Sequence, residues 1–259
     1  MEVGHEVRLY SATFPGPQET HFHGAFKSRQ SIAAVESLEE AAAFGEVLLM
    51  TRQAAGVRQA VDVIAGRLRP EQTVIFSAEL SFTSLYLARL LRQAGRQAQI
   101  ISWSTTVATA QRRPEGIRVG TLRSLIDMAA IGFPDAGVAR QLCTELFGDR
   151  FRLVAHPAVI GLSNLNPQIH LANSIANLTR IERGEDWENY LCITPAVGRL
   201  IERLDIERLG LASSFGFKVR DVHEHYLMTF PDIAPGTVSD MAGQVGAGTK
   251  GPVTLQNRY

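Results

Sequence analysis

The chain has 259 residues, enough for one large domain or, as we expect, two. It is 45% hydrophobic and 20% charged, a composition typical of a globular protein that buries a core. Basic and acidic residues number 26 each, and this zero net charge argues against nucleic acid or a membrane surface as the main partner.

No apolar run approaches the roughly 18 residues needed to span a bilayer. The first ten residues have neither the basic nor the apolar region of a signal peptide. Two cysteines, Cys143 and Cys192, lie far apart and match no zinc or redox spacing. We therefore expect a cytoplasmic protein.

Residues 1–155 alternate short β-rich runs with helical ones. Strands are predicted at His5–Tyr10, Ser31–Val35, Glu46–Thr51, Thr73–Ser77, Ala98–Trp103 and Ile117–Thr121. Helices are predicted at Leu38–Phe44, Ala54–Leu68, Thr83–Ala94 and Asp135–Phe147. Because each crossover helix must cover a sheet face, this alternation predicts an α/β domain with a doubly wound parallel sheet.

The pattern changes over residues 156–259, where few strand runs remain. Helices are predicted at His170–Arg183, Pro195–Gly210 and Ser239–Val245, and Val219–His225 is predicted as a short extended piece or a turn. The glycine-rich stretch 243–251 is predicted as a surface loop. It contains Gly-x-Gly-x-x-Gly, but no strand precedes it and a proline follows, which argues against a phosphate site. The second domain is therefore expected to be all-α.

The helix around His170 has a clear predicted start, with Asn166 as N-cap and Pro167 at the first helical position. Its polar residues fall on one arc at about 100° per residue: His170, Asn173, Ser174, Asn177 and Arg180. A solvated face is the commoner interpretation of such a stripe. An imidazole near a domain junction is also a candidate acid–base group, with a structural histidine as the alternative.

Three further features carry candidate chemistry. His21-Phe22-His23 and His223-Glu224-His225 each offer two imidazoles, but neither has a third ligand or the i,i+4 spacing of a metal site, so no metal is predicted. Arg258 could clamp a carboxylate with its planar guanidinium, although an arginine this close to the end of a chain is ordinarily solvated.

A resemblance to a known family rests on several of these residues. Asn164-x-Asn166-Pro167-x-x-His170, followed by Asn177 and Arg180-Ile181-Glu182, resembles the substrate-domain motif of the opine dehydrogenases (the octopine and nopaline dehydrogenase family). The same order as in that family's helical domain is kept by Ile193-Thr194-Pro195, Asp205-x-Glu207-Arg208 and Gly251-Pro252 with Arg258-Tyr259. The resemblance is specific over residues 163–258 and loose over the α/β half, where Gly4–Tyr10 resembles the second strand of the family's Rossmann domain.

The resemblance implies a Rossmann-like NAD(P)-binding domain and a helical substrate domain. It implies an NAD(P)-dependent oxidoreductase acting on CH–NH donors, which condenses an α-keto acid with the amino group of an amino acid and reduces the imine. The histidine that matches His170 is the family's catalytic acid–base group. Arg258 matches the arginine that binds the keto-acid carboxylate, and Asn177 matches a polar residue lining the same cleft.

The chain departs from the family pattern in three respects. The first Rossmann strand with its glycine-rich turn, and the acidic pair that follows Arg-Tyr in the family and orients the histidine, are both missing from the sequence. The resemblance therefore implies a chain truncated at both ends, with an incomplete NAD(P)-binding domain. Leu171-Ala172 replaces the usual prolines and Thr179 a usual glycine.

The cofactor is expected to be NADP or NAD. No acidic residue follows the strand that ends at Tyr10, where a ribose-binding carboxylate would favour NAD, so NADP is preferred. Ser11 and Thr51 are predicted to border the cofactor. Two alternatives stay open: a non-catalytic fragment or binding module without a complete nucleotide site, and another two-domain dehydrogenase of the ketopantoate reductase or glycerol-3-phosphate dehydrogenase type. The latter types use a catalytic lysine, for which Lys27 and Lys250 are poor candidates.

Overall fold

The computed structural model describes residues 4–11, 18–51, 54–79 and 82–248. The chain divides into two compact units, Met1–Gly161 and Leu162–Tyr259, called here the N-terminal and C-terminal units. No helix in these described ranges is long and apolar enough to cross a membrane.

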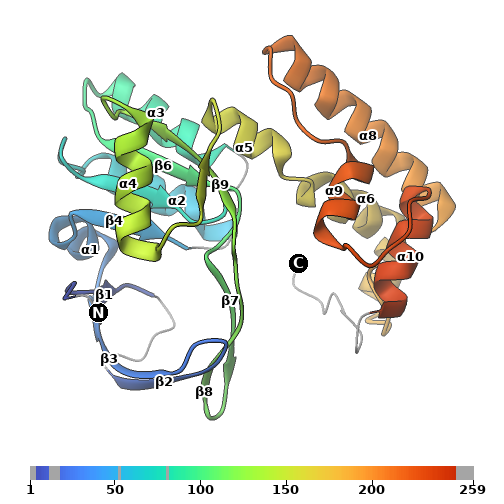
Figure 1. Ribbon diagram of the computed structural model, residues 1–259, viewed down its shortest axis with the longest axis horizontal. Helices are drawn as coiled ribbons and strands as arrows, with labels where there is room; N and C mark the ends of the chain where they lie inside the picture. Colours follow the sequence, from blue (N-terminus) through green and yellow to red (C-terminus); the bar gives the residue numbers. More distant parts are fainter. Residues whose placement is uncertain (1–3, 12–17, 52–53, 80–81, 249–259) are drawn as a thin grey trace. The chain divides into compact units, whose positions relative to one another are not determined.

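The main sheet of the N-terminal unit has five strands in the order β10-β9-β6-β5-β4 (Figure 1). The strands are β4 (Val47–Met50), β5 (Thr73–Phe76), β6 (Gln99–Trp103), β9 (Ile126–Ile131) and β10 (Phe151–Leu153). β4, β5 and β6 run parallel, and β9 is antiparallel to β6 but parallel to β10. The sheet is therefore mostly parallel, with one antiparallel pair that the alternating pattern did not predict.

Helices cover both faces of this sheet. β5 is an interior strand, and its four residues are all buried, as expected for a strand with apolar layers on both sides. Val74 and Phe76 pack in a core with α1 (Leu38–Phe44), α2 (Ala54–Ala65) and α3 (Thr83–Gln93). Ile75 points to the other side, toward α4 (Ala136–Phe147). The predicted doubly wound, Rossmann-like α/β unit is confirmed.

A second sheet in the same unit was not expected. Its order is β1-β3-β2-β8-β7, and the strands are β1 (Arg8–Leu9), β2 (Gln18–Gly24), β3 (Ser28–Ala34), β7 (Ala108–Arg113) and β8 (Gly116–Leu122). β2 is antiparallel to β3 and parallel to β8, and β7 is antiparallel to β8.

The two sheets show where the strand predictions were wrong. Three of the predicted runs form strands of the second sheet rather than of the main one: His5–Tyr10 contains β1, Ser31–Val35 overlaps β3, and Ile117–Thr121 lies within β8. β2 and β7 were missed because they are largely polar, and all of β7 is at least partly exposed. Such strands lack the apolar alternation that marks a half-buried strand. β9 and β10 were missed as well.

The C-terminal unit is helical in its described part. α5 (Pro157–Ser163) leads into α6 (Asn166–Ala176), α7 (Leu178–Glu182), α8 (Pro195–Ser214), α9 (Val222–Thr229) and α10 (Val238–Gly248). Its core combines apolar side chains of α6, α8, α9 and α10, including Ile169, Ile201, Tyr226 and Met241. The expected all-α second domain is confirmed.

Two local predictions in this unit were wrong. Val219–His225 contains the start of α9, because Asp221 and Glu224 form a reciprocal capping box. The glycine-rich stretch continues α10 as far as Gly248. At Gly246 a Cβ would lie 2.8 Å from the Leu191 side chain, so the missing side chain permits a close approach there. The rest of that stretch, from residue 249 onward, lies outside the described residues.

Candidate active site

The helix that carries His170 begins one residue earlier than predicted. Leu165 is the N-cap, α6 starts at Asn166, and Pro167 follows within the first turn. The Asn164 side chain accepts a hydrogen bond from the Asn166 backbone N–H at 3.1 Å. The local turn made by Asn164 satisfies a free N–H at the helix start, which is the role that the sequence assigned to Asn166.

His170 is half-buried on α6, and burial lowers the pKa of its imidazole below 6.5. Its Nδ1 atom is buried and has no hydrogen-bond partner among the described residues. Ser174 lies four residues further on, which places it on the same helix face one turn away. Its hydroxyl is likewise buried without a partner in the described part of the chain. These two groups form the candidate active site.

The polar stripe of α6 points into the unit. Asn173 is fully buried and donates from its amide nitrogen to the Asn189 side-chain oxygen at 2.8 Å and backbone oxygen at 2.9 Å. The exposed face is apolar, since Leu171, Ile175 and Leu178 are 58%, 62% and 52% exposed. The interpretation of the stripe as a solvated face is therefore wrong.

The C-terminal part of the polar stripe, Asn177 and Arg180, makes hydrogen bonds and an ion pair within the unit. Asn177 ends α6 and donates from its amide nitrogen to the Asn173 side-chain oxygen at 3.0 Å. Arg180 pairs with Glu185 at 2.9 Å, and this bond raises the pKa of the guanidinium. Arg180 also lies 3.1 Å from the Cys192 sulfur. α6 and α7 are thus separate helices joined at Asn177, where the sequence predicted one continuous helix.

A buried ion pair supports the His170 helix from α8. Arg208 donates from Nε and Nη2 to Asp205 Oδ1 at 2.9 and 2.7 Å, and the two side chains are only 7% and 4% exposed. The other Asp205 oxygen accepts from the Val222 N–H at 2.8 Å. Gln168 of α6 donates to Asp205 at 3.3 Å.

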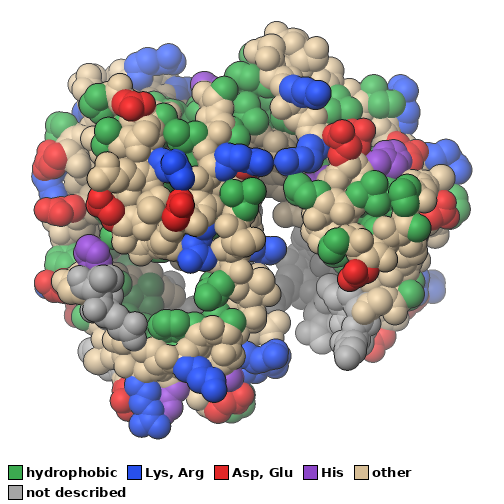
Figure 2. Space-filling view, viewed as in Figure 1, with side chains coloured by type: hydrophobic (Ala, Val, Ile, Leu, Met, Phe, Trp, Pro, Cys, Tyr) green, Lys and Arg blue, Asp and Glu red, His purple; other side chains and the backbone are tan. Residues whose placement is uncertain are grey.

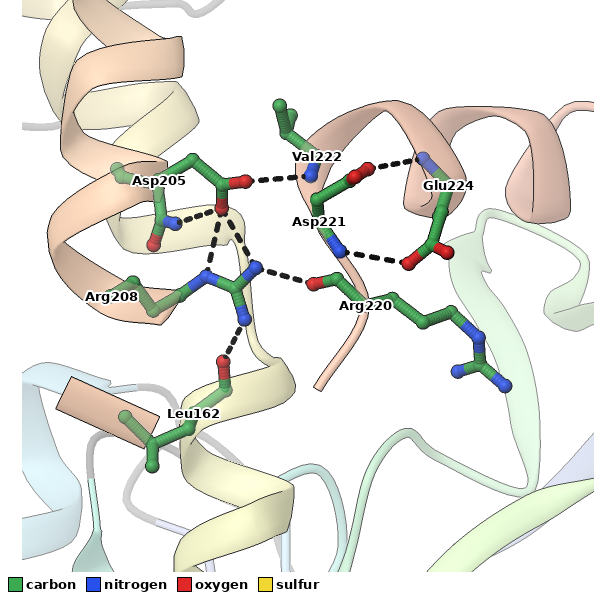
Figure 3. A network of polar contacts seen from close by, with 8 residues as sticks. Leu162, Asp205, Arg208, Arg220, Asp221, Val222 and Glu224 are labelled. Carbon is green, nitrogen blue, oxygen red and sulfur yellow. Dashed lines mark hydrogen bonds and ion pairs between the residues drawn. The ribbon is translucent and has the colours of Figure 1, made fainter. Parts of the chain in front are cut away.

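Arg208 also donates to two backbone carbonyls. Its Nη1 reaches the Leu162 oxygen at 2.5 Å, and Nη2 reaches the Arg220 oxygen (Figure 3). The pair therefore ties together α6, α8 and the start of α9. Asp205 and Arg208 are three residues apart in α8, a spacing that places them on one helix face. This spacing was the signal for the pair in the sequence, but the pair was not predicted from it.

The other predicted site residues are dispersed or undescribed. Arg258 lies outside the described residues. Thr51 is exposed directly after β4 in the main sheet, and Ser11 is exposed two residues after β1 in the second sheet. Thr51 therefore follows the carboxyl end of a strand of the α/β sheet, the edge where such sheets bind ligands. Ser11 follows a strand of the second sheet, to which this rule does not apply.

Glu79 is a buried carboxyl group that the sequence analysis did not single out. It follows β5, is 2% exposed, and accepts a hydrogen bond from the Ser84 N–H at 3.0 Å. Burial raises the pKa of this carboxyl. Ala78 and Phe82 on either side have φ of 63° and 64°, an unfavourable conformation for residues with a side chain. The available signal was a glutamate three residues after an apolar strand.

The described residues do not supply a complete nucleotide site. None of their strand-to-helix connections in the main sheet holds more than one glycine, whereas a pyrophosphate turn needs several for close backbone approach. No group of three or more His, Cys, Asp or Glu side chains in the described ranges could hold a metal ion.

The combination of a Rossmann-like unit and a helical unit is shared with dehydrogenases of solved structure. Apo yersinopine dehydrogenase superposes with a TM-score of 0.66 at 15% identity, covering 88% of this chain and 63% of that one. An octopine dehydrogenase with NADH and L-arginine gives 0.65 at 13% identity, covering 94% and 66%. A ketopantoate reductase from Ralstonia eutropha JMP134 gives 0.60 at 16% identity, covering 92% and 78%. These likenesses establish the fold.

The sequence comparisons show which family this chain resembles. Residues 154–259 match the family described as NAD/NADP octopine/nopaline dehydrogenase, alpha-helical domain. The opine dehydrogenase of Arthrobacter sp. (strain 1C) is 26% identical over 201 residues, which are 76% of this chain and 55% of that protein. The resemblance to the opine dehydrogenases is confirmed, and residues 154–259 carry the family's helical domain. The chain spans a little over half the length of this curated relative.

Proposed function

We propose that this chain belongs to an NAD(P)-dependent opine dehydrogenase, which joins an α-keto acid to the amino group of an amino acid by reductive condensation. The observation that carries the proposal is the position and environment of His170. It lies in the region that matches the family's helical domain, and its buried Nδ1 has no partner among the described residues. A buried polar atom without a partner is costly unless a ligand satisfies it.

The reaction requires several proton transfers. The amine adds to the keto carbon and water leaves, forming an imine; a hydride and a proton then reduce it to a secondary amine. Burial keeps the pKa of His170 low, so the imidazole is neutral near pH 7. It can accept a proton from the substrate ammonium, which frees the amine to attack, and return that proton to the hydroxyl that leaves as water. We propose His170 as this catalytic acid–base group.

The substrates need to be held while these steps occur. We propose that Arg258 binds the keto-acid carboxylate, because a guanidinium forms a two-point contact with a carboxylate. We propose Asn177 as a second polar residue beside the substrate. Its amide nitrogen is engaged by Asn173, which leaves the side-chain oxygen as the group for a substrate ammonium.

The proposed cofactor is NADP or NAD, which supplies the hydride. Related structures are described with NADH and with NADP+ bound. Ser11 and Thr51 are the residues proposed to border it, from their places after β1 and β4. The glycine-rich turn for the pyrophosphate is not among the described residues, so no further cofactor contact is assigned to this chain.

An activity assay and a binding assay together test the proposal. The chain, extended to the length of its curated relative, is combined with keto acids such as pyruvate, amino acids and NADPH or NADH, and the loss of nicotinamide absorbance is followed. Turnover that depends on both substrates supports the proposal. No turnover with any mixture, or a His170→Ala rate within about threefold of the unmodified chain, contradicts it, since acid–base catalysis contributes roughly 10²–10⁴-fold.

The alternatives give different results. Micromolar NADPH binding by calorimetry rules out a binding module that lacks a nucleotide site. Reduction of ketopantoate without an amino acid, lost in Lys27→Ala, identifies the ketopantoate reductase type instead. We further propose that the partners are small molecules only. We also propose a cytoplasmic location, which cell fractionation tests.

A further inference from the structure

Two β-hairpins lie side by side in the second sheet. β2 pairs with β3 in one hairpin and runs parallel to β8 of the other, so the β2–β3 turn and the β7–β8 turn lie at opposite ends of the paired segment. His21 lies directly opposite Arg29, and His23 lies directly opposite Arg118. Directly opposed residues share a face of the sheet, and so do residues two apart in one strand. One face therefore carries His21, His23, Arg29 and Arg118.

A hollow of about 510 Å³ lies beside these residues. Its lining includes His21, His23, Lys27, Arg29 and Glu115. It is an open depression of the surface rather than an enclosed cavity, and Lys27 and Arg29 are exposed on it. In Figure 2, Lys, Arg and His side chains gather with acidic ones at the lower end of the molecule, over β2, β3 and β8.

The permanent charges that line the hollow are two cations, Lys27 and Arg29, and one carboxylate, Glu115. Glu115 lies 3.5 Å from His23, and Glu19 lies 3.6 Å from His21. Lys27 and Arg29 have no carboxylate within ion-pair distance among the described residues. Lys27 and Arg29 therefore line the hollow without a carboxylate partner. The two nearest carboxylates, Glu19 and Glu115, lie beside the histidines instead.

We propose that this hollow binds a small anion with more than one negative charge, of the phosphate class. An arginine and a lysine together suit a phosphate group, since the guanidinium donates two parallel hydrogen bonds and the ammonium supplies a compact charge. The two imidazoles add ring N–H donors on the same face. No metal is invoked, because the described residues form no cluster of three ligands.

The hollow is separate from Ser11, one of the two positions proposed to border the cofactor. β1 pairs with β3 at Ala33 and Ala34, so Ser11 lies beyond the far end of β3. Arg29 is near the beginning of β3. The five residue steps from Arg29 to Ala34, at about 3.3 Å each, put roughly 16 Å between Arg29 and the end of β3, and Ser11 lies beyond that end. The inference is therefore independent of the proposed enzymatic function.

Calorimetric titration with inorganic pyrophosphate tests the proposal, with sodium chloride at equal ionic strength as the reference. We expect saturable binding that weakens about tenfold or more in Lys27→Ala/Arg29→Ala, because both hydrogen-bonding cations are lost. Glu115→Gln is expected to strengthen binding by about two- to fivefold, because it removes a competing negative charge. Inorganic phosphate and glycerol phosphate, titrated in parallel, show whether the free ion or an organic phosphate is preferred.

Arg112→Ala is the matched control. Arg112 is exposed on β7 and opposite Ile117, so it projects from the other face of the same sheet. Binding equal to that of chloride contradicts the proposal, as does an equal loss in Arg112→Ala and in the double variant, which indicates diffuse surface charge. Competitive displacement of pyrophosphate by NADPH places the hollow in the cofactor site and also overturns the inference of a separate site. Thermal melting confirms that each variant is folded.

Discussion

His170 and Ser174 lie one turn apart on the same face of α6, and both present a buried polar atom without a partner in the described part of the chain. An unsatisfied buried polar group costs about 1–3 kcal/mol. We propose that a bound molecule completes this pair, and the first two predictions depend on that proposal.

Under the proposed acid–base role, His170→Ala is expected to lower kcat/KM by roughly 10²–10⁴-fold. Little loss of stability is expected, because the imidazole makes no hydrogen bond through Nδ1 in the described chain. The measurement is steady-state kinetics with urea denaturation of the same preparation. Leu171→Ala, at a 58% exposed neighbour, is the control and is expected to keep the rate. Equal losses in both variants would show that the helix, rather than the imidazole, is responsible.

Ser174→Ala separates binding from folding. Removing a buried hydroxyl without a partner is expected to leave the free energy of unfolding unchanged or to raise it by less than about 1 kcal/mol. If the hydroxyl contacts substrate, KM rises about three- to tenfold while kcat changes little. A clear loss of stability with unchanged KM would assign Ser174 to the core instead.

Arg208→Met is expected to destabilise the chain by about 3–5 kcal/mol, because it leaves the Asp205 charge buried and unpaired. Urea denaturation measures this change. Arg67→Met is the control, since the Arg67–Glu39 pair is 49% and 46% exposed, and such pairs are worth about 0–1 kcal/mol. Similar effects for the two substitutions would contradict a special role for the buried pair.

Glu79 is expected to make stability fall as pH rises. Burial raises its pKa above 4.5 in the folded chain, so the folded state binds more protons than the unfolded state, and stability is lost as the pH rises from about 4.5 through the folded pKa. Glu79→Gln should remove this slope and stabilise the chain at neutral pH. Urea denaturation across this range measures it.

Glu71→Gln is the comparison for Glu79. The pKa of the exposed Glu71 is lowered, chiefly by a backbone hydrogen bond, so its contribution is present above pH 4.5 and lost as the pH falls. The two variants should therefore change the pH dependence of stability in opposite directions. A Glu79→Gln profile parallel to that of the unmodified chain would show that the carboxyl does not titrate abnormally.

Apolar periodicity determined the elements that bury large surfaces. α1 was predicted with its exact bounds, and β4, β5, β6, α2, α3, α4 and α8 were found within a few residues. The family resemblance likewise rested on local spacing around His170 and was confirmed over residues 154–259. The local pattern suffices to predict these elements, because the buried face of a helix or strand shows as a periodic spacing of apolar residues within one short stretch of sequence.

Only the tertiary structure decided which partner each element takes. The sequence could not separate two sheets in the N-terminal unit, because strand pairing joins residues such as His23 and Arg118 that are far apart in the chain. It also could not show that the stripe of Asn173 faces inward while Leu171 and Ile175 face solvent. A polar residue can be buried when another polar group satisfies it, as Asn189 does for Asn173, and that partner is fixed by the fold.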